Sequence, residues 1–217
     1  MGDMLLSEKQ RKGRAVPSTV VTLHSHGLCA VGWTDGLLTL IDTAAGRVHS
    51  QWEAVEGPIL SITVLPDHCD ILLVFSSKML WIWDIRMPEP RGVVGFSWDS
   101  AASSTLTHAN RGCVITFSDV QQVTHICFID VVGIHTILPR LPALSSSLKG
   151  DACPLPLPGD DGGGEGPAHS HIRPFVHVRP LLAKSSRSSP SLLTSACLPL
   201  SKLLAFGTSD GHLQVYA

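Results

Sequence analysis

The feature that most constrains this chain is a short apolar run, closed by an aspartate, that recurs along the sequence. It reads Leu-Leu-Thr-Leu-Ile-Asp at Leu37–Asp42, Leu-Trp-Ile-Trp-Asp at Leu80–Asp84 and His-Ile-Cys-Phe-Ile-Asp at His125–Asp130. A related run without the aspartate, His-Leu-Gln-Val-Tyr-Ala, occupies His212–Ala217. The closing aspartates are 42 and 46 residues apart. A recurring spacing of this length indicates a protein built from repeated supersecondary units.

Each repeated run is expected to be a β-strand within a hairpin. Ile71–Phe75 and Leu80–Arg86 are rich in β-branched and aromatic residues, and only Ser76–Met79 separates them, which is typical of a β-hairpin. The turn ahead of the run also recurs, as Thr34-Asp35-Gly36 and as Ser209-Asp210-Gly211. The sequence therefore predicts an all-β protein.

A period of about 40 to 45 residues with a Trp-Asp ending is the spacing of a four-stranded propeller blade. The sequence resembles the WD-repeat β-propeller family over residues 18–138 and 191–217. The resemblance implies a WD-repeat-like β-propeller, here incomplete, with three whole blades and most of a fourth. The expected strands are 19–23, 28–33, 37–41 and 47–52 in the first blade, 59–65, 71–75, 80–85 and 93–96 in the second, unassigned strands within 103–138 in the third, and 193–198, 203–208 and 213–216 in the last.

Composition divides the chain into four parts. Residues 1–17 form a polar, basic tail, and residues 18–138 carry the first three blades. Residues 139–190 are rich in Pro, Gly and Ser, which remove ladder donors and add chain entropy, so this segment is predicted to be a disordered insert. Residues 191–217 resume the pattern as a partial blade.

The strand count predicts an open ring. The last blade is one strand short, whereas propellers close with typically four to eight blades and closure removes exposed sheet edges. We therefore expect this chain to belong to a longer form or to be completed by another chain, and to self-associate when isolated.

The family resemblance also implies residues that hold a blade together by hydrogen bonds among Trp, Ser or Thr, His and Asp. Trp83 matches the Trp position, Thr208 the strand hydroxyl, and Asp35 and Asp210 the turn aspartate. The other Trp positions hold Ile41, Ile129 and Tyr216 instead. Three more aspartates close the third strands of the blades, namely Asp42, Asp84 and Asp130.

The stretch Trp83-Asp84-Ile85-Arg86 also resembles the Trp-Asp-x-Arg element of WD-repeat substrate receptors of cullin-type ubiquitin ligases. This resemblance implies that Trp83, Asp84 and Arg86 bind the ligase's adaptor, because an exposed Arg makes bidentate hydrogen bonds that Lys cannot. The sequence departs from the family pattern at Lys78, where an acidic residue is usual. The alternative is an ordinary blade ending.

Charge and cysteine usage limit the compartment and the partners. The net charge is −2, and only 16% of residues are charged, so a polyanion is not expected as the main partner. No apolar run is long enough to span a membrane. Six cysteines without a Cys-x-x-Cys pair predict buried free thiols, hence an intracellular protein, cytoplasmic or nuclear.

The eleven histidines include His24-Ser25-His26 and His169-Ser170-His171, but no Cys or acidic residue lies at ligand spacing from them in the sequence. Phosphate-binding and nucleophile motifs are also missing. We expect no metal site, no cofactor and no enzymatic activity.

The leading hypothesis is a non-catalytic protein–protein interaction scaffold that is a subunit of a larger intracellular complex. One alternative is a substrate receptor of a cullin-type ligase. Another is a nuclear or nucleolar factor associated with RNA or ribosome assembly, suggested by the basic tail.

Overall fold

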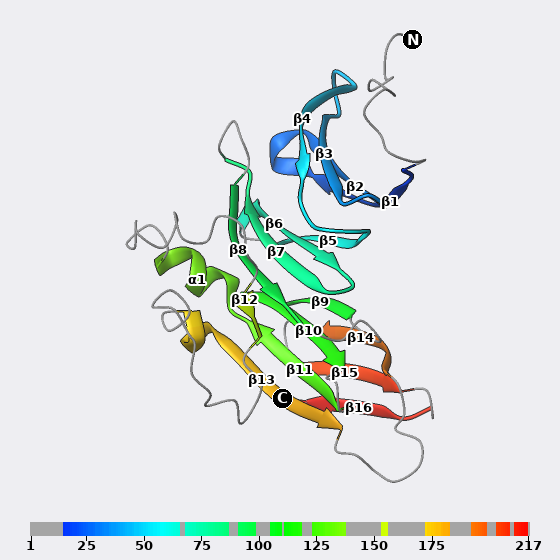
Figure 1. The fold of residues 1–217 in the computed structure, drawn as a ribbon, viewed down its shortest axis with the longest axis vertical. Coiled ribbons are helices and arrows are strands. Elements are labelled where there is room, and N and C mark those ends of the chain that lie inside the picture. The colour runs from blue at the N-terminus through cyan, green and yellow to red at the C-terminus, as the bar shows by residue number, and fades with distance from the viewer. Residues whose placement is uncertain are drawn as a thin grey trace. The chain divides into compact units, whose positions relative to one another are not determined.

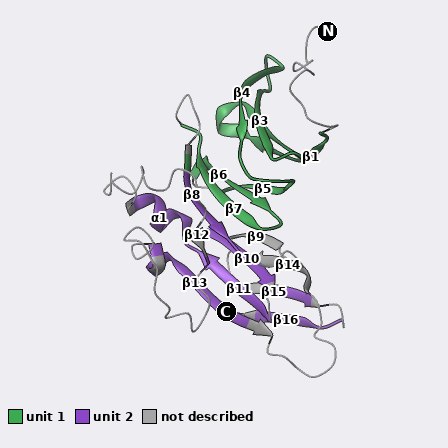
Figure 2. Ribbon diagram, in the orientation of Figure 1, with its two compact units in different colours: residues 1–92 green, residues 93–217 purple. Residues whose placement is uncertain are grey.

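The computed structural model describes residues 15–65, 68–86, 91–98, 105–109, 111–118, 123–137, 153–155, 172–182, 192–198, 203–208 and 211–216 (Figure 1). The chain divides into two compact units, residues 1–92 and 93–217 (Figure 2). The predicted basic tail, except for residues 15–17, lies outside the described residues.

The first sheet of unit 1 is an antiparallel meander of four strands, in the order β1 (Pro17–Leu23), β2 (Leu28–Trp33), β3 (Leu37–Asp42) and β4 (Arg47–Glu53). A short 3-10 turn, η2 (His24–His26), joins β1 to β2. Glycines with positive φ lie in the three connections, where hairpins require the left-handed region; they are Gly27, Gly36 and Gly46. The four strands predicted for the first blade are confirmed.

The second sheet of unit 1 contains β5 (Ile59–Leu65), β6 (His68–Ser76) and β7 (Met79–Asp84), again antiparallel. Strand β6 is buried without interruption from Ile71 to Ser76, as expected for a strand covered on both faces. The two sheets meet where Ile59 packs against Gly32 of β2. The contact is so close that a Cβ added to Gly32 would collide with the Ile59 side chain. Ile59 is fully buried.

Unit 2 contains a four-stranded sheet and a three-stranded sheet. The first has the order β9 (Thr105–Ala109), β10 (Gly112–Ser118), β11 (Thr124–Ile129) and β13 (Val176–Leu182). The second has the order β14 (Leu192–Leu198), β15 (Leu203–Thr208) and β16 (Leu213–Tyr216). The boundary between the units falls within β8 (Arg91–Ser97), whose Phe96 and Ser97 pair in parallel with the short β12 (Cys153–Pro154).

Strand β13 corrects one prediction. Residues 139–190 were expected to contain no sheet, yet Val176–Leu182 is hydrogen-bonded to β11 as the fourth strand of this blade. The strand accommodates Pro180 because it lies at the end of the described sheet order, where a strand is hydrogen-bonded on one side only. The rest of the predicted insert lies outside the described residues, apart from 153–155 and 172–175.

Between β11 and β13 the chain forms α1 (Val131–Ile137) and the 3-10 turn η4 (Arg173–Phe175), neither of which was predicted. Within the described part of the chain, no helix has the length and apolar character needed to cross a membrane.

Candidate functional site

The aspartates that close the third strands act first as local turn caps. In the first blade the Asp42 carboxylate accepts hydrogen bonds from the backbone N–H groups of Ala44 and Ala45, at 2.8 and 2.9 Å. These backbone donors hold the pKa of the exposed Asp42 carboxyl below its ordinary value, and the Ala45 N–H has the larger effect of the two. Each such bond satisfies a donor as the chain leaves the strand.

The other two aspartates make the same kind of bond. Asp84 accepts from the backbone N–H of Arg86 at 3.0 Å, and Asp130 from that of Gly133 at 2.8 Å. The second oxygen of Asp130 is 3.0 Å from the Arg111 guanidinium, so Asp130 both caps α1 and holds an ion pair. The recurrence of Asp at these positions therefore reflects turn geometry.

Trp83 lies in a cluster of three indoles in unit 1. Its ring centroid is 5.6 Å from that of Trp52 in β4 and 6.0 Å from that of Trp81 in β7. The buried Nε1 atoms of Trp52 and Trp83 have no hydrogen-bond partner among the described residues. Trp83 thus contributes ring packing between the first two blades.

The indole-to-hydroxyl hydrogen bond of the first blade is made by Trp33, which the repeat pattern did not indicate. Trp33, at the end of β2, donates its Nε1–H to Thr39 Oγ1 of β3 at 2.9 Å, and Thr39 is fully buried. Thr39 is the one polar residue in the apolar run 37–41, and this was the feature of the sequence that pointed to the hydrogen bond. The turn aspartate Asp35 is exposed and accepts a bond from Leu37 N at 3.3 Å. The Thr208 side chain and Asp210 lie outside the described residues.

Asp84 and Arg86 of the Trp-Asp-x-Arg element pair with each other. The Arg86 Nε lies 2.9 and 3.1 Å from the two carboxylate oxygens of Asp84, and its Nη2 also bonds that carboxylate. The Arg86 side chain is 52% exposed and that of Asp84 13% exposed. The carboxylate raises the pKa of Arg86, so the guanidinium keeps its charge.

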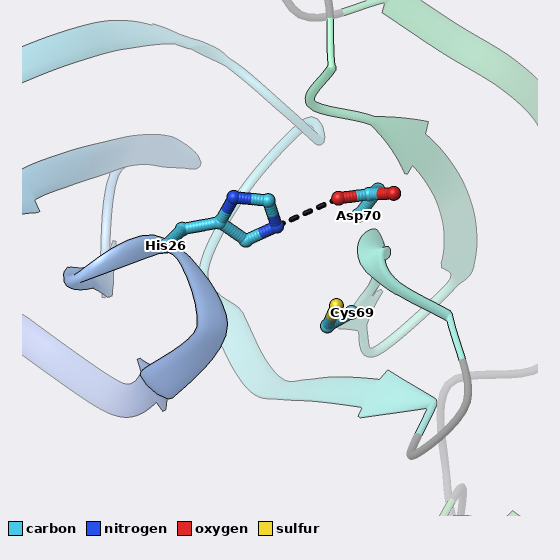
Figure 3. A group of neighbouring side chains, drawn as sticks. All are labelled: His26, Cys69 and Asp70. Carbon is cyan, nitrogen blue, oxygen red and sulfur yellow. Dashed lines mark ion pairs between the residues drawn. The ribbon is translucent and has the colours of Figure 1, made fainter.

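A second cluster joins residues that are far apart in the sequence (Figure 3). His26 of η2 places its Nε2 2.6 Å from Asp70 Oδ1 in β6, and the Cys69 thiol lies beside them. One nitrogen, one sulfur and one oxygen thus lie within 4.8 Å of one another. Sequence spacing showed no Cys or acidic partner for His26, because the two blades bring these side chains together only in the folded chain.

The last described strand presents apolar side chains to solvent. Leu213 and Val215 of β16 are 70% and 53% exposed. They are two residues apart on one strand, so they point to the same face of the sheet. Their cross-strand neighbours on β15 are the small residues Gly207 and Ala205.

No protein-family model and no curated protein matches the sequence. Solved structures do match the fold. The β-propeller domain of Cps50 (Swd1) from Myceliophteria thermophila has a TM-score of 0.55 at 12% identity, over 96% of this chain and 56% of that chain. Raptor from Chaetomium thermophilum scores 0.59 at 12% identity, over 95% of this chain and 16% of that one. The C-terminal WD40 domain of Sif2 scores 0.53 at 12% identity, over 91% and 44%.

These likenesses show the fold alone, because the identities are low. The chain is an incomplete WD40-type β-propeller, as the sequence predicted, and spans 56% or less of each of these three structures.

Proposed function

We propose that this chain, which has the fold of a WD40 β-propeller domain, is a non-catalytic protein–protein interaction scaffold and a subunit of a larger complex in the cytoplasm or nucleus. The observation that carries the proposal is the exposed apolar face of β16, formed by Leu213 and Val215.

Strand β16 offers both a backbone edge and an apolar face. In the described sheet it pairs with β15 and stands last in the order β14-β15-β16. A strand from a partner placed along this edge would satisfy its backbone groups and cover the two side chains. Because Gly207 and Ala205 lie opposite Leu213 and Val215, the face has room for larger side chains from the partner.

The test is affinity purification with cross-linking and mass spectrometry, comparing the unmodified chain with the Leu213→Ser, Val215→Ser variant. We expect the same cross-linked proteins to be recovered in much smaller amounts with the variant, because the apolar contact is lost. The matched control is Val48→Ser, which removes another exposed apolar side chain from β4. Equal recovery with all three proteins would contradict the proposal.

A more specific candidate is a substrate receptor of a cullin-type ligase. It is favoured by the placement of Arg86, which is half-exposed just after β7 and is oriented by the Asp84 carboxylate. An oriented guanidinium loses less side-chain freedom when it binds a second acceptor.

Arg86→Ala is expected to abolish co-purification of the ligase adaptor without lowering expression, since an exposed ion pair contributes about 0–1 kcal/mol to stability. Arg47→Ala, which removes another exposed Arg from β4, is the control. Adaptor binding that survives Arg86→Ala, or that the unmodified chain lacks, would rule out the receptor role.

A further inference from the structure

The cluster of His26, Cys69 and Asp70 lies within unit 1, at the junction of two blades. His26 belongs to the turn η2 between β1 and β2, and Cys69 and Asp70 belong to the beginning of β6 (Figure 3). The side chains of His26 and Asp70 are 33% and 34% exposed, and Cys69 is half-buried. A small ion from solvent can therefore reach all three.

A β-bulge explains why two adjacent residues contribute to one site. Successive side chains of a regular strand point to opposite faces. In the pairing of β5 with β6, however, Val64 lies opposite Leu72 and Leu65 opposite His68, so residues 69–71 have no counterparts on β5. This bulge breaks the alternation and lets Cys69 and Asp70 approach the same imidazole.

The donor set suits a zinc ion. Imidazole nitrogen, thiolate sulfur and carboxylate oxygen are the ligands of Zn²⁺ in proteins, and three of them with one water make an open tetrahedral site. Tetrahedral ligands lie about 3.4 to 3.8 Å apart at the usual metal–ligand distances. The three ligand atoms are already within 4.8 Å, so an adjustment of about 1 Å completes the geometry.

We propose that His26, Cys69 and Asp70 bind one Zn²⁺ ion at the surface of unit 1 and so tie the η2 turn of the first blade to β6 of the second. On binding, the Cys69 thiol gives up its proton to solvent, and the metal takes the place of the hydrogen bond between His26 and Asp70. The site requires no substrate or partner protein and is independent of the proposed scaffold role.

The experiment uses the 217-residue chain with Co²⁺ as a spectroscopic probe and Zn²⁺ as competitor. We expect one equivalent of Co²⁺ to produce a thiolate-to-cobalt charge-transfer absorption, which Zn²⁺ then removes. Cys69→Ser should abolish the absorption, and Asp70→Asn or His26→Gln should weaken Zn²⁺ binding by about tenfold or more. Cys69→His should retain Zn²⁺ binding while losing the charge-transfer absorption, because imidazole is also a zinc ligand.

Two controls match the ligands closely. His24→Gln changes the other imidazole of the same turn, and Cys29→Ser changes a half-buried thiol of β2. Both should bind Co²⁺ and Zn²⁺ as the unmodified chain does, and circular dichroism should show that all variants fold. Failure of the unmodified chain to bind either metal, or an unchanged spectrum in Cys69→Ser, would overturn the proposal and leave a surface His–Asp ion pair.

Discussion

The glycine of the Asp35-Gly36 turn shows how a single position supports a blade. Gly36 has a φ of +87°, and its carbonyl accepts hydrogen bonds from Ala54 N at 3.0 Å and Val55 N at 3.4 Å. A Cβ at this position would collide with the backbone carbonyl oxygen of Val55. The turn thus anchors the segment that leads from the first blade into the second.

Gly36→Ala is expected to lower the free energy of unfolding by about 2 kcal/mol or more, since it combines left-handed strain with a backbone clash. Gly46→Ala is the matched control, because its φ is +63° and nothing lies within 4 Å of its added Cβ. That variant should lose only about 1 kcal/mol. Chemical denaturation measures both, and equal losses would show that the Val55 contact does not matter.

At the scale of the element, β10 and β11 bury two thiols in one blade. Cys113 and Cys127 are fully buried and carry free thiols. The pKa of Cys113 is raised well above its ordinary value of 9.0, mainly by burial and to a smaller extent by the neighbouring Cys127. Burial also raises the pKa of Cys127. The two strands therefore hold both thiols in the neutral form.

The raised pKa values predict a loss of stability in alkali. In the unfolded chain the thiols release protons near their ordinary pKa of 9.0, whereas the folded chain keeps them protonated. The unfolded state then binds fewer protons, so stability is fully present below about pH 8 and falls above about pH 9 by up to about 1.4 kcal/mol per pH unit for each thiol. Urea denaturation at a series of pH values measures this slope. The Cys113→Ala, Cys127→Ala variant should show a shallower slope, and an unchanged one would contradict the assignment.

At the scale of the whole molecule, we expect β16, which stands last in its sheet among the described strands, to govern behaviour in solution. A sheet edge with an apolar face is a template for another chain, and β16 exposes Leu213 and Val215. We expect the isolated 217-residue chain to sediment as species larger than a monomer, in proportions that increase with concentration. Leu213→Lys should shift the distribution toward the monomer, because a charge on an edge strand opposes pairing, whereas Val48→Lys should not. A single monodisperse monomer at all concentrations would refute this prediction.

Much of the fold could be predicted from the sequence because its signals are local. The strands at 28–33, 59–65 and 203–208 have the predicted bounds, since apolar runs and Gly-containing turns act over a few residues. The aspartates at the ends of the third strands were identified for the same reason. Helix α1 was missed because its seven residues follow an apolar strand without a change in composition.

The sequence by itself determined the repeat, the all-β class and the positions of most strands, because each depends on neighbouring residues. Only the tertiary structure decided which distant segments meet. It placed β13 beside β11 across the long connection after α1, and it brought Cys69 and Asp70 to His26. Both contacts join segments more than forty residues apart. Such contacts follow from the stacking of blades and from a bulge in one strand, and no local pattern of residues encodes either.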